Sequence, residues 1–331
     1  MSLRGLRVAS ALLCVWGAAG CQGRSPAPEG GGSASAAPAA PPATDGLVAR
    51  IEKGDADGAL AQLEGRGDPE ALYLQGRAWA KKADSAPLPT PVPLLEPLPK
   101  GAPPPAPPEF KPEEQKAIEL YERAIAASPD LAAAHLALAQ VLAPHAVRFR
   151  ERERDAQARQ ALRRPGRQAP EPLPTPEPGV DYSADRVLRE YGLAVRGDPS
   201  RAPVEAMIAF AVKAGRLDEA DAGYQELIRR LKERGEPFTL YGDFLLQEKK
   251  DPAAAIEQYR QALIWSPQDD VTRAKLANVF LNRGVDFFNQ QQYASAEAQF
   301  AEAAKYIPDK NSPEGRLLAE HQAKLREIRL R

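Results

Sequence analysis

The chain has 331 residues, of which 43% are hydrophobic and 6% aromatic, and its formal net charge is −1 at pH 7. This apolar content is enough to bury a core, so the chain as a whole is not a disordered protein. The formal net charge becomes −3 once Arg4 and Arg7 are removed with a predicted signal peptide. This excludes an overall positive charge that would attract nucleic acid or an anionic membrane. Abundant alanine and few aromatics favour an all-α fold.

Residues 1–21 have the pattern of a lipoprotein signal peptide. A positive segment, "MSLRGLR", precedes the apolar "VASALLCVWGAAG", which is too short to span a bilayer. The next residues, Ala18, Ala19, Gly20 and Cys21, resemble the bacterial lipobox; Ala18 stands where leucine is usual, which leaves cleavage by ordinary signal peptidase as the alternative. The resemblance implies lipidation of Cys21 with two or three acyl chains, a stable membrane anchor. Gln22 in place of aspartate implies the outer membrane, with the periplasmic face as the expected side.

The residues after the leader are predicted to tether the folded part. Cys14 leaves with the leader and Cys21 is acylated, so neither a disulfide nor a cysteine metal site is expected. Residues 22–45 are rich in Pro, Ala and Gly and carry no large apolar side chain, so we expect them to be disordered. A coil of about 24 residues has an r.m.s. reach of roughly 25–30 Å.

From residue 46 onward a helical pattern repeats. A small residue is followed by an aromatic four positions later, a second small residue after three more and a proline after another five. Small residues seven apart share one helical face and let a neighbouring helix approach, the aromatic fills the groove between them, and the proline ends the helix. The four occurrences, with Val187 as the one larger member, are Ala117, Tyr121, Ala124, Pro129; Val187, Tyr191, Ala194, Pro199; Ala255, Tyr259, Ala262, Pro267; and Ala296, Phe300, Ala303, Pro308.

This pattern resembles the second helix of a tetratricopeptide repeat, whose first helix follows W-x2-L-G-x2-Y. First-helix matches are Leu72, Gly76, Trp79; His135, Leu138, Ala139, Leu142; Phe280, Gly284, Phe287; and, more weakly, Val204, Met207, Ala211 and Phe238, Tyr241, Gly242, Leu245. The resemblance covers most of residues 46–310. It implies a right-handed α-solenoid of about five repeats over residues 46–312, covered by a capping helix over residues 313–331.

Two departures from the regular repeat predict helix lengths. Pro237 arrives five residues late after Ala220 and Tyr224, so we expect that second helix to run on through "LIRRLKER". Pro267 and Pro308 are 41 residues apart against the usual 34, so the helix that begins near Asp270 is expected to be about two turns longer than standard.

The spacing between paired motifs locates two insertions inside repeats. In a regular repeat the first-helix aromatic precedes the second-helix small residue by nine positions. Trp79 and Ala117 are 38 apart, and Leu142 and Val187 are 45 apart, which leaves excesses of 29 and 36 residues. We therefore predict insertions at residues 83–112 and 144–182, within one continuous solenoid rather than between domains.

The composition of the insertions leaves their role open. Prolines at nearly every second position in residues 83–112 and 169–178 predict extended polyproline II. These runs are either tolerated surface loops or arms that engage a partner groove, with Val92 to Pro99 as the contact. Residues 146–168 carry a net charge of +5, and are either a solvated continuation of the preceding helix or a contact for an anionic surface such as lipid phosphates.

Catalytic and cofactor motifs are missing from the sequence. The histidines, His135, His145 and His321, have no second ligand at metal spacing, and there is no phosphate loop, nucleophile elbow or HExxH. We expect no enzyme activity, cofactor, metal or small-molecule substrate. The predicted export of the protein, and the lack of aromatic residues between the basic ones, argue against nucleic acid as a partner.

The resemblance also implies where a partner binds. In this family the first helices line the concave face, with the residues one and five after the opening large position pointing into it. The residues so nominated are Tyr73, Arg77, Leu136, Gln140, Glu205, Ala209, Thr239, Asp243, Leu281 and Val285. None of these pairs has the Lys and Asn with which chaperone-binding relatives hold a C-terminal carboxylate.

The expected function is an outer-membrane-anchored scaffold whose groove binds another cell-envelope protein, in an assembly or adaptor role. The alternative is a structural spacer that contacts an anionic cell-wall or lipid surface through the proline-rich arms and the basic segment.

Overall fold

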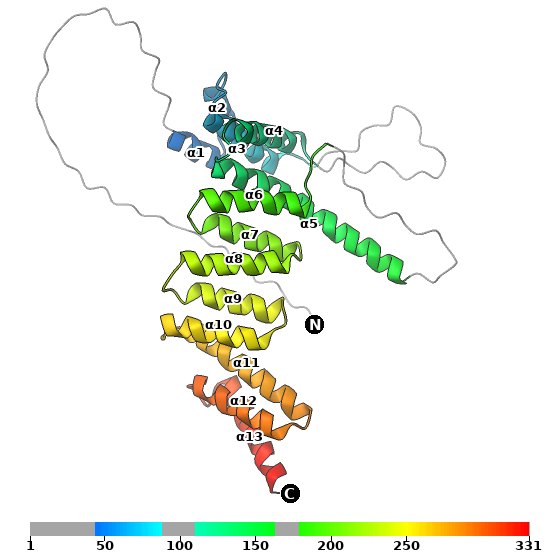
Figure 1. Ribbon diagram of the computed structural model, residues 1–331, viewed down its shortest axis with the longest axis vertical. Helices are drawn as coiled ribbons and strands as arrows, with labels where there is room; N and C mark the ends of the chain where they lie inside the picture. Colours follow the sequence, from blue (N-terminus) through cyan, green and yellow to red (C-terminus); the bar gives the residue numbers. More distant parts are fainter. Residues whose placement is uncertain (1–43, 88–109, 163–178, 331) are drawn as a thin grey trace, which may run out of the picture. The chain divides into compact units, whose positions relative to one another are not determined.

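The computed structural model describes residues 44–87, 110–162 and 179–330, and every regular element in them is a helix (Figure 1). The predicted signal peptide at 1–21, nearly all of the 22–45 tether, and residues 88–109 and 163–178 of the insertions lie outside the described residues. The helices are α1 (Thr44–Glu52), α2 (Ala56–Gln62), α3 (Pro69–Ser85), α4 (Pro112–Ala127), α5 (Ala132–Leu162), α6 (Ala184–Gly197), α7 (Ala202–Lys213), α8 (Leu217–Arg230), α9 (Glu236–Gln247), α10 (Pro252–Trp265), α11 (Asp270–Asn289), α12 (Tyr293–Tyr306) and α13 (Pro313–Arg329).

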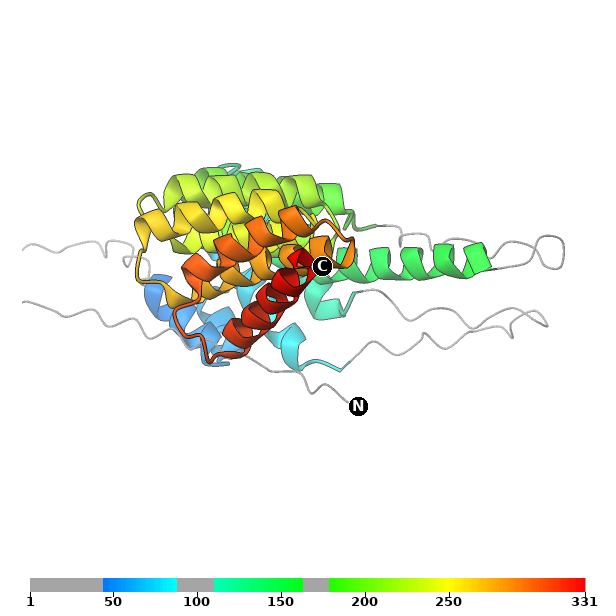
Figure 2. The same ribbon diagram turned by 90° about the horizontal axis from the view of Figure 1, so that it is seen from below.

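The helices from α3 to α12 form five consecutive pairs. α3 packs on α4, α5 on α6, α7 on α8, α9 on α10 and α11 on α12, and each second helix also contacts the first helix of the next pair. Figure 1 shows α6 to α10 stacked in chain order, and Figure 2 shows the same helices from below. The predicted all-α solenoid of tetratricopeptide type, with five repeats, is confirmed.

Small residues and aromatic rings hold four of the five pairs together as the sequence pattern predicts. The eight small positions of the four second-helix motifs are all fully buried: Ala117, Ala124, Val187, Ala194, Ala255, Ala262, Ala296 and Ala303. The ring of Tyr121 fills the space above Gly76, where a Cβ atom would lie 2.6 Å from the ring. Paired helices therefore approach to the distance that a glycine on one helix and a ring on the other allow.

Helix starts use acidic or hydroxyl caps together with proline. Asp68 and Asp251 accept hydrogen bonds from backbone N–H groups in the first turns of α3 and α10, and Ser312 does the same for α13. Each of these helices has proline in its first turn, where the missing N–H has no intrahelical partner to lose.

A short helical pair precedes the first repeat and was not identified from the sequence. Leu47 and Ile51 of α1 and Leu63, which follows α2, pack with Leu74 of α3 in one buried cluster. α1 and α2 therefore cover the apolar face that α3 would otherwise expose at the end of the solenoid.

One of the two length predictions is confirmed and the other is wrong. α11 has 20 residues, whereas α7 and α9 have 12 each, which is about two turns longer. α8 ends at Arg230 and does not continue through "LIRRLKER". The chain turns at Glu233, which has a φ of 64°, and at Gly235, where a Cβ atom would lie 2.6 Å from the Ala262 carbonyl oxygen. A longer α8 would displace this close contact with α10.

The second predicted insertion begins as helix. α5 has 31 residues and runs through Pro144 to Leu162, so the basic segment continues the preceding helix as far as Leu162. Figures 1 and 2 show its C-terminal half extending beyond the neighbouring helices. Helices resume at Pro112 and at Ala184, after the cap Ser183, as the motif spacing predicts.

Both insertions return to the repeats at one aromatic cluster. Phe110 stacks on His145 of α5 with ring centroids 3.9 Å apart, and Tyr182 lies edge-on to Phe110 at 5.4 Å. Lys111 Nζ donates to the carbonyl oxygens of Ala83 and Ala86, at 2.6 and 2.8 Å. The chain therefore leaves the first repeat and re-enters it at the same point.

Candidate functional site

A large hollow lies between α1, α3 and α5, on the face that the repeat pattern nominated in the first two repeats. Its volume is about 910 Å³, and Tyr73 and Arg77 of α3 and Leu136 and Gln140 of α5 all line it. Each pair is spaced by four residues, so both members lie on the same face of their helix. The four residues nominated from α3 and α5 are therefore brought together.

Two cations inside this hollow, Arg77 and Lys81, already have carboxylate partners. Arg77 Nη2 donates to Glu52 Oε1 at 3.1 Å, and Lys81 Nζ lies 3.5 Å from Asp84 Oδ2. Burial alone would lower the pKa of Arg77, but Tyr73 and Glu52 raise it overall, so the guanidinium stays charged. Burial raises the pKa of Tyr121, which also lines the hollow, so its hydroxyl stays neutral. The hollow offers neutral hydrogen-bonding groups and apolar surface rather than one net charge.

The opposite wall connects the hollow to the return point of the first insertion. Glu114 Oε2 accepts from the Lys111 backbone N–H at 2.7 Å, and Glu114 Oε1 lies 3.4 Å from His145 Nε2. Burial works to raise the pKa of Glu114, but His145 and the Lys111 N–H lower it overall. The carboxylate is therefore held ionised between the insertion and α5.

A second hollow continues the first one along α5. It has a volume of about 420 Å³, and Gln140 and Pro144 line both hollows. Its other lining residues come from α5, α6 and α7: Ala143, Val147, Arg148, Tyr191, Ala206, Ala209, Phe210 and Lys213. We call the two hollows together the α3–α5–α7 groove.

The sequence predicted only some of the residues that line this second hollow. Ala209 was nominated and lies in it. Val147, Arg148 and Lys213 were missed, because residues from 144 onward were assigned to an insertion and Lys213 lies four positions beyond Ala209. The residues after Pro144 have a composition that favours helix, and this could have predicted that α5 continues along the groove.

Two nominated residues are buried and cannot line a groove. Thr239 is 8% exposed, and its hydroxyl lies 2.6 Å from the Thr272 hydroxyl of the next repeat. Leu281 is 2% exposed and lies in the same core cluster as Leu318 and Leu325 of α13. The nomination of Thr239 and Leu281 is therefore corrected: packing by α11 on α9 and by α13 on α11 covers them.

The remaining nominated residues are engaged by neighbours. Glu205 Oε1 accepts from Arg201 at 2.5 Å. Asp243 accepts from the Tyr259 hydroxyl at 2.8 Å and pairs with Lys275 at 2.5 Å. Val285 is half-buried against the C-terminal core. Asp243 connects two repeats, Glu205 is paired at the start of its own helix, and Val285 packs into the core, so the nominated surface that stays open is the one on α3, α5 and α7.

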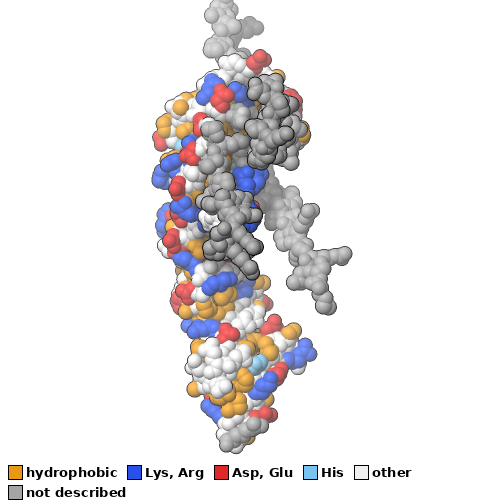
Figure 3. Space-filling view, turned by 90° about the vertical axis from the view of Figure 1, so that its right-hand side faces the viewer, with side chains coloured by type: hydrophobic (Ala, Val, Ile, Leu, Met, Phe, Trp, Pro, Cys, Tyr) orange, Lys and Arg blue, Asp and Glu red, His pale blue; other side chains and the backbone are white. Residues whose placement is uncertain are grey.

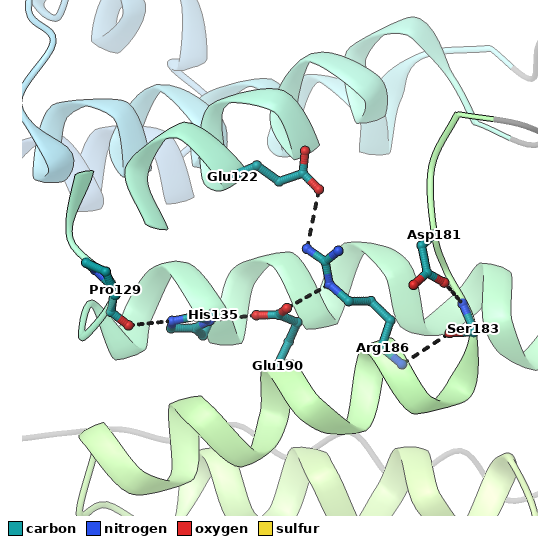
Figure 4. A network of polar contacts seen from close by, with 7 residues as sticks. All are labelled: Glu122, Pro129, His135, Asp181, Ser183, Arg186 and Glu190. Carbon is teal, nitrogen blue, oxygen red and sulfur yellow. Dashed lines mark hydrogen bonds and ion pairs between the residues drawn. The ribbon is translucent and has the colours of Figure 1, made fainter. Parts of the chain in front are cut away.

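A buried polar network lies behind the groove, between α4, α5 and α6 (Figure 4). His135 Nδ1 lies 2.6 Å from Glu190 Oε2, and Nε2 donates to the Pro129 carbonyl oxygen at 2.8 Å. Arg186 Nε donates to Glu190 Oε1 at 2.7 Å and reaches Glu122 at 3.3 Å. Both ring nitrogens of His135 are therefore occupied, and the residue has a structural role.

Metal-binding and membrane-spanning features are missing from the described part of the chain. Its residues contain no group of three or more His, Cys, Asp or Glu side chains that could hold a metal ion. No described helix combines the length and the apolar character needed to cross a bilayer. On the face drawn in Figure 3, positive and negative side chains are interspersed.

No protein-family model matches the sequence, and no curated protein matches it. Solved structures of tetratricopeptide-repeat proteins are similar. TTC0263 of Thermus thermophilus is 18% identical over 72% of this chain and 97% of its own, with a TM-score of 0.36. PilF of Pseudomonas aeruginosa is 15% identical over 78% and 91%, with a TM-score of 0.32. YrrB, described as having an unusual peptide-binding site, is 13% identical over 85% and 100%, with a TM-score of 0.35. The assignment of the repeats rests on the packing positions described above.

Proposed function

We propose that this protein is an interaction scaffold that is lipid-anchored at the outer membrane and holds a segment of another cell-envelope protein in the α3–α5–α7 groove. The observation that carries the proposal is the convergence of Tyr73, Arg77, Leu136 and Gln140 on one hollow of about 910 Å³. Two first helices of consecutive repeats supply these residues, which is the arrangement that a bound extended or helical segment requires.

The chemistry of the groove favours a protein segment over a small charged ligand. Leu136, Ala137 and Val141 provide apolar contact, whereas Gln140 and the Tyr73 hydroxyl can hydrogen-bond to a backbone. Arg77 and Lys81 in the first hollow already have carboxylate partners, so a free anion would have to displace Glu52 or Asp84. A segment with apolar side chains and backbone hydrogen-bonding groups needs no such displacement.

Site-specific photo-crosslinking in cells tests the proposal. A benzophenone side chain at Gln140 is expected to give a covalent adduct with one envelope protein, which mass spectrometry then identifies. The matched control is the same side chain at Gln225, an exposed glutamine of the second helix α8. Equal adducts at both positions, or an adduct only at Gln225, would show that the groove is not the binding surface.

The anchor is tested separately because Cys21 lies outside the described residues. The lipobox resemblance supports acylation of Cys21, so the Cys21→Ser variant is expected to move from the membrane fraction to the soluble fraction and to lose labelling by radioactive palmitate. Retention of the variant in the outer membrane would contradict a lipid anchor and leave the groove proposal intact.

The alternative is a spacer that contacts an anionic surface through the arms and the basic segment. Residues 146–162 contain five arginines and three acidic residues, which gives a net charge of +2. The C-terminal half of α5 extends beyond the neighbouring helices (Figure 1). Deletion of residues 88–109 and 163–178 discriminates between the two functions. The Gln140 adduct survives this deletion if the protein is a scaffold, whereas sedimentation with anionic vesicles is lost only if it is a spacer.

A further inference from the structure

The buried network behind the groove has more hydrogen-bond acceptors than a neutral histidine can satisfy (Figure 4). His135 lies between two oxygens that only accept: the Pro129 carbonyl oxygen is 2.8 Å from Nε2, and Glu190 Oε2 is 2.6 Å from Nδ1. A neutral imidazole has one N–H, and its other nitrogen is itself an acceptor. Each of the two contacts needs a hydrogen of its own. The geometry therefore requires one proton more than a neutral imidazole and an ionised carboxylate carry together.

The surroundings of this pair favour the additional proton. His135 is 3% exposed and Glu190 is 5% exposed. The α4–α5 turn contributes only the carbonyl oxygen, and Leu138, one turn further along α5, is apolar and buried. From α6, Arg186 Nε donates to Glu190 Oε1 at 2.7 Å, and the same guanidinium reaches Glu122 of α4 at 3.3 Å. One cation faces two carboxylates, so the additional proton changes the net charge of the network from −1 to 0.

We infer that His135 and Glu190 together hold one proton that the unfolded chain releases at neutral pH, so that the junction of α4, α5 and α6 is a pH-sensitive contact that weakens as the pH rises. The hydrogen lies between Nδ1 and Glu190 Oε2, and the count of protons is the same whichever atom carries it. The inference depends neither on the proposed function nor on the lipid anchor. It concerns the groove because Leu136, the next residue, lines the first hollow.

The direction of the pH effect follows from the pH at which each state loses the proton. A histidine in an unfolded chain loses its proton near about pH 6.5. Below that pH both states carry the proton, and the stabilisation from the two contacts is fully present. Above it the unfolded chain has released the proton and the folded pair still holds it. Each further pH unit then raises the unfolding equilibrium constant about tenfold, until the folded pair releases the proton as well.

Loss of the proton should open the contact with Pro129 first. A neutral imidazole has a single N–H for two acceptors, and hydrogen bonds to a charged acceptor are stronger than those to a neutral one. The N–H therefore stays with the buried carboxylate of Glu190. Pro129 is exposed, so water can replace the donor at its carbonyl oxygen. The contact that opens is the one between the α4–α5 turn and the first turn of α5.

Urea denaturation of the full chain in detergent, at several pH values, counts the proton. Glu190→Gln is the informative variant, because its amide can donate to Nδ1 and accept from Arg186 without an additional proton. Relative to this variant, the unfolding equilibrium constant of the wild type should rise about tenfold per pH unit between about pH 7.5 and about pH 9. His321→Gln is the matched control, since it removes a histidine of α13 outside the network and should keep the wild-type pH dependence.

Two results of this comparison would overturn the inference: the same pH dependence in the wild type and in Glu190→Gln, or an equal reduction by His321→Gln. A second measurement needs no variant and so decides the matter even if Glu190→Gln fails to fold. Nitrogen-15 NMR of the ring and carbon-13 NMR of the carboxyl, at about pH 8, should find either hydrogen on both ring nitrogens of His135 or a protonated Glu190. A ring with one N–H beside an ionised Glu190 would show that the additional proton is absent.

Discussion

Gly242 of α9 lies directly against the ring of Tyr259 in α10, where a Cβ atom on the glycine would stand 2.6 Å from Tyr259 Cε1. The same relationship recurs between Gly76 and Tyr121 and between Gly284 and Phe300. In three of the five repeats, therefore, the absence of a side chain on the first helix makes room for the ring on the second helix. The glycine of the repeat motif is required by space and not by backbone conformation, since all three lie within helices.

Replacement of Gly242 by alanine should destabilise the fold. Overpacking of this kind costs about 1–3 kcal/mol, which exceeds the gain in helix propensity of about 1 kcal/mol. Gly192→Ala in α6 is the matched control, because a Cβ atom there meets nothing within 4 Å and only the propensity gain remains. Urea denaturation should show opposite signs for the two variants; stabilisation by both would disprove the spatial requirement at Gly242.

The buried pair of His135 and Glu190 should be strongly coupled. His135→Leu leaves the Glu190 carboxylate buried with Arg186 as its remaining partner, and a buried acceptor that loses a hydrogen bond costs about 1–3 kcal/mol. The double variant His135→Leu with Glu190→Leu should recover much of that loss, because no carboxylate oxygen is then buried without a partner. A double-mutant cycle by chemical denaturation measures the coupling. Additive effects of the two changes would contradict it.

Stability should fall at acidic pH partly through Glu226. Arg229 and then Arg230 lower the pKa of this carboxyl from 4.5 to about 2. Because the folded-state pKa is below the unfolded value, the stabilisation is fully present above pH 4.5 and is lost as pH falls towards 2. Glu226→Gln removes this dependence, so the difference in stability between wild type and variant should shrink between about pH 5 and about pH 3. Urea denaturation at several pH values checks this, and a constant difference would be inconsistent with the lowered pKa.

Substitution by glutamate should have a large effect on stability at a core position and a small one at a groove position. Leu281→Glu places a carboxylate at a position that is 2% exposed, without a partner, and should destabilise the C-terminal repeats by about 3 kcal/mol or more. Leu136→Glu alters a half-buried wall of the groove and should cost less than about 1.5 kcal/mol while abolishing the Gln140 adduct. Thermal unfolding followed by circular dichroism compares them. A native-like midpoint for Leu281→Glu would refute its assignment to the core.

Removal of residues 88–109 should preserve the first repeat. Lys111 holds Ala83 and Ala86 at the point of return, so a linker of about four glycine and serine residues can bridge Pro87 and Phe110. Shortening a loop from about 22 to about 4 residues lowers its closure entropy and should raise stability by about 1–2 kcal/mol. Thermal unfolding gives the change. A clear loss of stability would mean that the deleted segment packs against the repeats.

Local packing rules in the sequence account for most of the fold. The spacing of small and aromatic residues describes contacts between adjacent helices, which is why all eight small positions, including Ala117 and Ala303, are buried. α1 and α2 have no such motif, because their burial depends on the particular end of α3 that they cover. α5 continues past Pro144 because Arg, Glu, Ala and Gln favour helix and because Val147 and Phe149 still pack against the core.

The groove could be predicted only where nothing else covers the first helices. Positions one and five after the opening residue select Tyr73, Arg77, Leu136 and Gln140, and all four line one hollow. The same rule failed at Thr239 and Leu281, because contacts with Thr272 and with α13 depend on the length of α11 and on the terminal helix. A motif rule places a side chain on a face of its own helix, whereas exposure depends on what the rest of the chain brings against that face.

The shared return point of the insertions has a mechanical consequence. Phe110 and Tyr182 precede α4 and α6, and both rings contact His145. Each insertion is therefore attached to the repeats in two different ways: at its start it continues directly from α3 or α5, and at its end it passes this ring cluster before α4 or α6 begins. A pull on the returning end would load the three rings before it loads the helix that follows, so the two return ends share one point of attachment on α5.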